Sequence, residues 1–159
     1  MAPAPGGRDR DEHGRARNAR PRDELGRPLP YGSAGIEPLP EDLVLPAAET
    51  LVQAQQLLDV ERPFQAHEVL EARWKSCPPD ERQLWQGLAQ LAVGLTHLRR
   101  GNATGAAAVL ARARQHLSDS AGPRYGVDVT GLCTWATEAV DAAGGPEQDH
   151  LVAPPRLTG

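Results

Sequence analysis

The sequence is short of several features that mark large classes of protein. Its 159 residues hold only two cysteines, Cys77 and Cys133, which are far apart and form no CxxC pair, so we expect no disulfide framework. A formal net charge of -4 argues against a surface devoted to nucleic acid, which needs a basic field. No apolar stretch near Met1 resembles a signal peptide, and none is long enough to span a membrane. We therefore expect a cytoplasmic protein without nucleic-acid or membrane partners.

The two ends of the chain differ in composition from its middle. Residues 1–40 are rich in proline, glycine and arginine with interspersed acidic residues, a composition that buries too little apolar surface to offset the entropy of ordering it. We predict a mostly disordered arm over residues 1–40, a helical domain over 41–143 and a disordered tail over 144–159. For the apolar residues between Leu25 and Ile36 a second interpretation stays open, in which they lie extended along a groove of the domain.

Helical periodicity and capping residues divide the middle of the chain into helices. Pro63 suits a first helical position, and Asp80 with Gln83 three residues later has the spacing of a capping box. Asn102 and Asp128 have the side chains of helix caps. The first helix begins near residue 41 or 46 and ends at 59, and the others cover about 63–75, 81–100, 103–121 and 129–143. Because no segment alternates in the manner of a strand, we predict an all-α fold, a compact bundle of about five helices.

One stretch of the chain carries no Asp, Glu, Lys or Arg, although about a quarter of all residues are charged. It runs from Leu84 to Leu98, with its leucines on one helical face and Gln86, Gln90 and His97 on the opposite face. An exposed helix would carry charges on that second face. We therefore predict a central helix that is buried on both sides. Buried glutamines and histidines must find partners, because an unpaired polar group in a core costs about 1–3 kcal/mol.

Polar residues of this helix and of the helix predicted over about 63–75 can form a cluster where the two helices pack together. His67 and Glu71 are i, i+4 neighbours on the preceding helix and can share a hydrogen bond that fixes the imidazole tautomer. The expected cluster consists of His67, Glu71, Gln86, Gln90 and His97.

Three interpretations of the cluster stay open. It can be a hydrogen-bonded network that fixes the register of the helices. It can be a site for a divalent metal such as zinc or iron, with His67, Glu71 and His97 as ligands, since residues 67–71 look like a zincin HExxH helix in which Glu71 replaces the second histidine. It can also be a metal-free site in which Glu71 poises His67 for acid–base chemistry or for binding a small ligand.

The residues of this region resemble a known family. The pattern consists of Phe64-x-Ala66-His67-Glu68-x-x-Glu71-x-x-Trp74, then Gln86-Gly87-x-x-Gln90-x-Ala92, then His97-x-x-x-Gly101-Asn102-x-x-Gly105-Ala106. It is similar to domain of unknown function family 309, a bacterial, archaeal and plant group of small proteins, and the similarity extends over about residues 62–117. The resemblance implies an all-α fold without an established activity, and it gives weight to the polar cluster.

Two functional hypotheses follow from the sequence. The leading one is a non-catalytic cytosolic scaffold or interaction module, in which the cluster is internal and a surface groove binds a protein or small-molecule partner. The rival is a metal-dependent hydrolase-like enzyme with His67, Glu71 and His97 as ligands and Glu68 as the candidate base. Neither the partner, the substrate nor the oligomeric state follows from the sequence.

Overall fold

The computed structural model describes residues 9–10, 16–17, 21–40, 43–120, 122, 124–144 and 152–159. This part of the chain contains five α-helices, as the sequence predicts: α1 Ala47–Asp59, α2 Pro63–Ser76, α3 Arg82–Arg99, α4 Ala103–Asp119 and α5 Val129–Ala143. A short 3₁₀ helix, η1 Pro79–Glu81, precedes α3. Two strands of two residues each, β1 Asp9–Arg10 and β2 Ala16–Arg17, form a small antiparallel pair. The fold is all-α.

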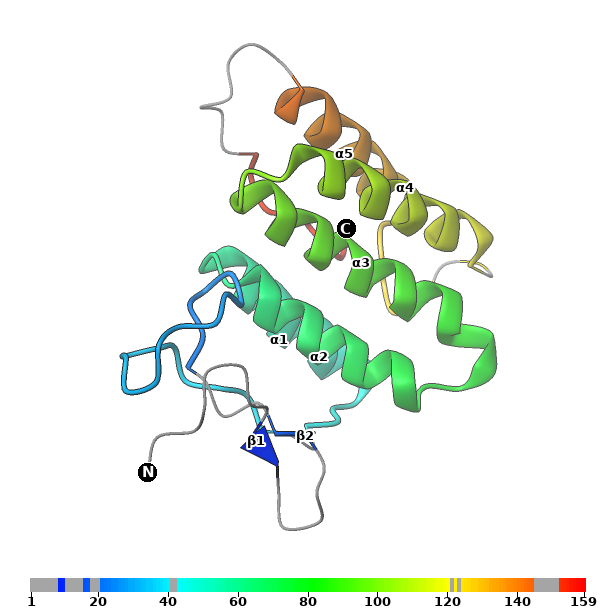
Figure 1. Cartoon of the computed structure of the whole chain (residues 1–159). Helices are drawn as coiled ribbons and strands as arrows, with labels where there is room; N and C mark the ends of the chain where they lie inside the picture. Colours follow the sequence, from blue (N-terminus) through cyan, green and yellow to red (C-terminus); the bar gives the residue numbers. More distant parts are fainter. Residues whose placement is uncertain are drawn as a thin grey trace.

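The helices are arranged around α3, which lies between α2 and α4 (Figure 1). α1 packs against α2, and α5 packs against α4. The turns that join α2 to α3 and α3 to α4 are short, so each pair runs antiparallel. The first turns of α2 consequently lie beside the last turns of α3. The prediction of a central helix is confirmed, but the prediction that it is buried on both sides is wrong, because the side with Gln86, Gln90 and His97 is only half-buried.

Close packing of α3 against α4 depends on two glycines. A Cβ atom at Gly94 would lie 2.3 Å from Leu110 Cδ2, and one at Gly87 would lie 2.8 Å from Leu117 Cγ. Neither distance leaves room for a side chain. The buried residues of α3 are Leu84, Trp85, Gly87, Leu88, Ala89, Leu91, Ala92, Gly94, Leu95 and Thr96. They occupy more than half of the helix circumference, and the stripe with Gln86, Gln90, Val93 and His97 is only half-buried.

Two of the predicted helix caps form as expected. The side chain of Asn102 accepts a hydrogen bond of 3.0 Å from the backbone N–H of Gly105 at the start of α4. Asp128 accepts one of 3.1 Å from the N–H of Gly131 at the start of α5. Both caps use local contacts within three residues, and for that reason the sequence alone identifies them.

The capping box predicted for α3 is wrong. The helix begins through η1, and Glu81 is its N-cap residue without a side-chain capping bond. Asp80 instead pairs with Arg124, at 2.6 Å, and Gln83 is hydrogen bonded to His116 of α4. Both side chains take tertiary partners, which compete with the local capping bonds that the spacing suggests.

The prediction of a disordered tail is wrong for residues 152–159, which pack on the domain. Pro155 and Leu157 are buried, and Leu157 is only 1% exposed. Thr158 forms an antiparallel bridge with Val127, ahead of α5. The composition of the segment gave no sign of these contacts. Two buried side chains are enough to fix a short extended peptide on a domain, even when the rest of the segment is polar or rich in proline. Residues 145–151 lie outside the described residues.

Residues 21–40 contact the domain at the start of α2 and the end of α3. Gly26 has φ +73° and lies so close to the ring of Phe64 that a Cβ atom would be 2.3 Å from it. The side chain of Gln65 donates a 2.7 Å hydrogen bond to the backbone carbonyl of Glu37, and Arg100 donates one to that of Leu25. The prediction of a disordered arm over residues 1–40 is therefore wrong for residues 21–40, and of residues 1–20 the structure describes only 9–10 and 16–17.

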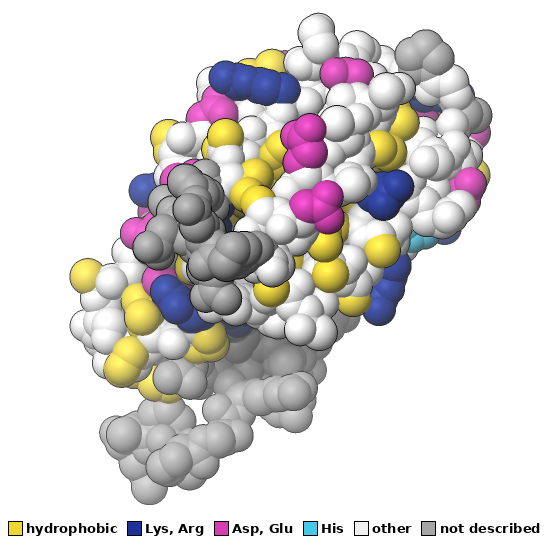
Figure 2. Space-filling view, turned by 90° about the horizontal axis from the view of Figure 1, so that it is seen from above, with side chains coloured by type: hydrophobic (Ala, Val, Ile, Leu, Met, Phe, Trp, Pro, Cys, Tyr) yellow, Lys and Arg dark blue, Asp and Glu magenta, His cyan; other side chains and the backbone are white. Residues whose placement is uncertain are grey.

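The described surface carries both signs of charge. Seen from above, basic and acidic side chains are interspersed with scattered hydrophobic atoms (Figure 2). On this face they form no extended basic area of the kind that binds a nucleic-acid backbone. Among the described residues, none of the helices has both the length and the hydropathy needed to cross a membrane.

Candidate functional site

The pair predicted on α2 is present. Nε2 of His67 lies 2.8 Å from Oε2 of Glu71, with side chains that are 21% and 32% exposed. Nζ of Lys75 lies 3.0 Å from the other carboxylate oxygen of Glu71, one turn further along. The ring of Phe64 stands 5.5 Å from that of His67 on the preceding turn. The sequence places this pair among the apolar anchors of α2, whereas in the structure it lies at the edge of the buried face.

The surroundings of His67 favour a neutral imidazole. Burial lowers the pKa of His67 and outweighs the neighbouring carboxylate of Glu71, which raises it. A neutral ring that donates its Nε2 proton to Glu71 keeps Nδ1 as an acceptor. That Nδ1 atom is buried and has no hydrogen-bond partner among the described residues. His67 is therefore bound to Glu71 through Nε2, and its second ring nitrogen is buried.

Glu68, the candidate base, is close enough to Glu71 for the two carboxylates to interact. Much of the Glu68 side chain is exposed, but its carboxyl group is partly removed from water, and this raises its pKa. The positive charge of Arg22 in the N-terminal segment lowers the pKa and opposes that shift, whereas the carboxylate of Glu71 raises the pKa further. The guanidinium of Arg22 lies over the ring of Phe64, 5.6 Å from its centroid. Glu68 thus faces the N-terminal segment rather than the polar stripe of α3.

His97 has a local role at the turn between α3 and α4. Its Nδ1 lies 3.1 Å from the side-chain nitrogen of Asn102, the cap of α4. The amide of Asn102 donates to the ring while its oxygen accepts from the first turn of α4. His97 therefore supports the helix cap and is hydrogen bonded to neither His67 nor Glu71.

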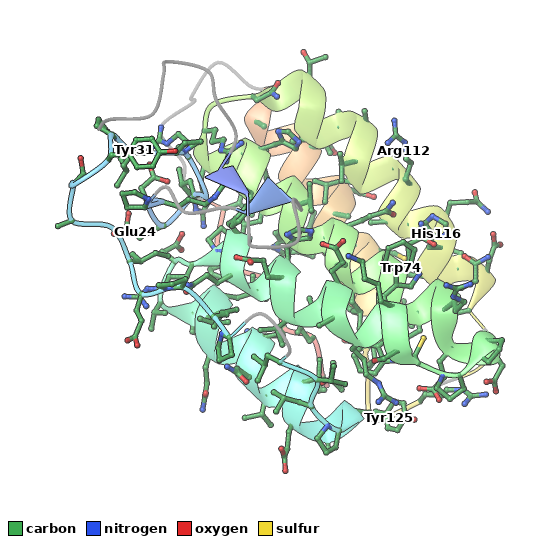
Figure 3. All side chains as sticks on the ribbon, turned by 60° about the horizontal axis from the view of Figure 1, so that its bottom comes forward. Glu24, Tyr31, Trp74, Arg112, His116 and Tyr125 are labelled. Carbon is green, nitrogen blue, oxygen red and sulfur yellow. The ribbon has the colours of Figure 1, made fainter. Side chains whose placement is uncertain are left out.

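The half-buried stripe of α3 lies at the surface between α2 and α4. It carries Gln86, Gln90, Val93 and His97, and we call it, together with His67, Glu71 and Trp74 of α2, the polar face. The side-chain oxygen of Gln90 is buried without a partner in the described part of the chain. On α4, which also carries Arg112, His116 is hydrogen bonded to Gln83 of α3 (Figure 3).

The structure does not assemble the proposed metal ligands. Within the described residues, no group of three His, Cys, Asp or Glu side chains is placed to hold a metal ion. His67 and Glu71 come together, but the ring of His97 bonds to Asn102 and to neither of them. The five residues of the predicted cluster thus share one region of the molecule without forming one hydrogen-bonded network.

Sequence reasoning missed a buried carboxylate at the start of α3. Glu81 is only 4% exposed and accepts a 3.1 Å hydrogen bond from the indole N–H of Trp85. Arg73 and Arg124 each place a guanidinium nitrogen 3.7 Å from this carboxylate. A hydrogen bond to Glu81 raises the pKa of Tyr125. This cluster joins the α2–α3 and α4–α5 connections, and no local spacing in the sequence signals it.

Neither cysteine has the surroundings of a nucleophile. Cys77 and Cys133 are free thiols, both half-buried. Burial raises the pKa of Cys77, and the nearby carboxylate of Glu81 adds to that shift. A thiol with a raised pKa holds little thiolate at neutral pH, and the thiolate is the reactive form.

The helices that carry the polar face fall in a region with known relatives. Residues 51–109 match the family model described as Domain of unknown function (DUF309). Over these residues the chain is similar to the DUF309 family. The matched segment covers all five residues of the predicted polar cluster, so the resemblance drawn from the sequence is confirmed over these residues.

One curated relative of the DUF309 region is the "Uncharacterized protein YpuF" of Bacillus subtilis. It is 49% identical over 49 residues, which are 30% of this chain and 28% of that protein. The chain thus spans less than a third of the length of this relative. No solved structure matches the chain. The comparisons place the polar face in a family whose function is undetermined.

Proposed function

We propose that the protein is a non-catalytic, cytosolic interaction module that binds a protein partner through the polar face. The main support for this proposal is that the polar stripe of α3 is only half-buried, although the other sides of the helix are fully packed. Its free thiols suit a reducing compartment.

Hydrogen bonding supports a binding role over a catalytic one. His67 pairs within its own helix and His97 pairs with a helix cap, so both histidines stabilise local structure. A general base or a metal centre would need these groups to converge on a reacting atom. The metal-dependent hydrolase hypothesis has no corresponding arrangement among the described residues.

The residues around the polar face suit a protein partner. Trp74 is half-buried and packs partly on the core, while Arg112 on α4 is exposed. Tryptophan and arginine are enriched at the centres of protein interfaces, because each buries a large area and still offers a donor. The polar groups of Gln86 and Gln90 on α3 provide further hydrogen-bonding capacity.

Photocrosslinking tests this proposal. The photoreactive residue p-benzoylphenylalanine is placed at Trp74 and, as a control, at Val52, which is 58% exposed on α1. In the cells that produce the protein, we expect the residue at position 74 to give one discrete protein adduct and the residue at position 52 to give none. The charge change Gln86→Glu should weaken the adduct at least fivefold, while Gln56→Glu on α1 should leave it unchanged.

Two outcomes would overturn the proposal. One is an absence of adducts from position 74 in protein that keeps its native circular dichroism. The other is the same set of adducts from positions 74 and 52, which would indicate nonspecific contact. If Gln86→Glu leaves the yield of the adduct from position 74 unchanged, the partner binds to a surface other than the polar face.

A further inference from the structure

The last eight described residues lie on the domain in the manner of a bound peptide. Residues 152–159 run between α1, α3 and α5, and the C-terminus ends near the middle of the molecule (Figure 1). This surface is separate from the polar face and plays no part in the proposed function.

Side chains of the helices bind the main chain of this segment. The amide of Gln55 on α1 donates to the carbonyl of Pro155, at 3.0 Å, and accepts from the N–H of Leu157, at 2.9 Å. The indole of Trp135 on α5 donates to the carbonyl of Ala153, at 2.8 Å. A primary amide that pairs with both a carbonyl and an N–H reproduces the contacts of a neighbouring strand.

Further main-chain contacts come from both ends of the segment. Arg99 on α3 donates to the carbonyl of Val152, at 2.6 Å, and its side chain is only 9% exposed. At the other end, the carbonyl of Leu157 accepts from the N–H of Asp128, at 3.1 Å, and the N–H of Gly159 donates to the carbonyl of Gly126, at 3.2 Å. These bonds hold the segment extended and are independent of its side chains.

Two side chains of the segment supply sequence selectivity. Pro155 and Leu157 are buried, and between them Arg156 points outward, 3.3 Å from Asp59. Recognition thus combines main-chain hydrogen bonds with pockets for alternate side chains, as in peptide recognition by strand addition.

We propose that the groove between α1, α3 and α5 is a binding site for an extended partner peptide with the pattern proline, basic residue, leucine. Residues 152–159 are its internal ligand. Gln55, Asp59 and Arg99 belong to the DUF309 region, whereas the bound segment lies outside it, so the groove and its occupant are separate parts of the chain. Because the segment and the groove belong to one chain, the segment competes with a free peptide at an effective concentration on the order of millimolar. A partner peptide must therefore displace the segment to bind.

The test uses the full chain with a protease site inserted between residues 145 and 151. The probe is a fluorescent synthetic peptide of residues 152–159, followed by polarisation. After cleavage, the chain should keep its helical circular dichroism and bind the probe saturably, and unlabelled peptide should compete. The uncut chain should bind at least tenfold more weakly. A probe with Leu157→Asp should not bind, which tests the groove without altering the protein.

A matched pair of variants locates the site. Gln55→Ala in the cleaved chain should weaken probe binding at least tenfold, whereas Gln56→Ala, one exposed position further along α1, should not change it. Equal binding by the two variants would overturn the proposal. So would loss of helical structure on cleavage, which would make the segment an integral part of the fold. A folded, cleaved chain that fails to bind the probe would also contradict it.

Discussion

The two sides of α3 are built from the same helix but have different surroundings. On the side with Leu84, Leu88, Leu91 and Leu95, each leucine is at most 2% exposed and packs in the core. On the side with Gln86, Gln90 and His97, the side chains are half-buried, and the oxygen of Gln90 lacks a partner among the described residues. Both sides lack charges, so the absence of charge by itself does not distinguish a core from a recognition surface.

The difference between the sides lies in the type of uncharged residue. Leucine removes apolar area from water and contributes roughly 1.5–3 kcal/mol when fully buried. Glutamine and histidine contribute hydrogen-bonding groups that remain useful only if a partner reaches them. We therefore expect the leucine side of α3 to stabilise the fold and the polar face to bind a partner.

The largest expected effect is on the leucine side. Leu88 is fully buried, and Leu88→Ala should lower the free energy of unfolding by about 2–5 kcal/mol, because it removes buried methyl groups and leaves a cavity. Gln86→Ala on the polar face should change it by only about 0.5 kcal/mol. Urea unfolding followed by circular dichroism measures both. Equal losses would show that the two sides are packed alike.

The next effect concerns the close contact with α4. In Gly94→Leu the new side chain meets Leu110, so we expect a loss of about 1–3 kcal/mol or more from overpacking. Gly144→Ala is the control, because a Cβ atom there would lie 3.7 Å from its nearest neighbour, an ordinary contact. A melting temperature of Gly94→Leu equal to that of wild type would place this side of α3 in solvent.

A smaller and unequal pair of effects is expected on α2. Glu71→Leu removes the acceptor of His67 and should cost about 1–3 kcal/mol, whereas His67→Gln can keep one hydrogen bond and should cost about 1 kcal/mol or less. Thermal unfolding of both variants gives the comparison. If His67→Gln is the more damaging change, the imidazole has a role beyond its bond to Glu71.

The smallest effect is a dependence on pH. Burial holds the pKa of His67 below its unfolded value of about 6.5, so the unfolded chain binds the proton first. This contribution to stability is present above the unfolded pKa and is lost as the pH falls through the folded pKa. Melting temperatures between pH 7.5 and 5 should fall less steeply in His67→Gln than in wild type. Parallel curves would exclude His67 as the group responsible.

The helices were predictable from the sequence because their signals are local. The caps Asn102 and Asp128 bond within three residues, and the burial of one side of α3 follows from the helical spacing of its leucines. The capping box of Asp80 failed because a tertiary partner, Arg124, takes the side chain. Long-range pairings of this kind have no fixed spacing and cannot be read from one sequence.

The candidate site was predictable only in part, for the same reason. The bond between His67 and Glu71 is local and was predicted, while the separation of His97 from them depends on its bond to Asn102. The buried carboxylate of Glu81 and the docking of Leu157 need partners more than forty residues away and gave no local signal.

The metal content of the protein tests most directly whether the polar face is a hydrogen-bonded surface or a metal centre. The full chain is purified without a chelator or an affinity tag, and its zinc, iron and manganese are measured by elemental analysis. We expect far less than one metal ion per chain in the wild type and the same low metal content in His67→Gln, Glu71→Leu and His97→Gln. About one ion per chain in the wild type, lost in all three variants, would contradict this expectation and make the metal-dependent enzyme the leading hypothesis.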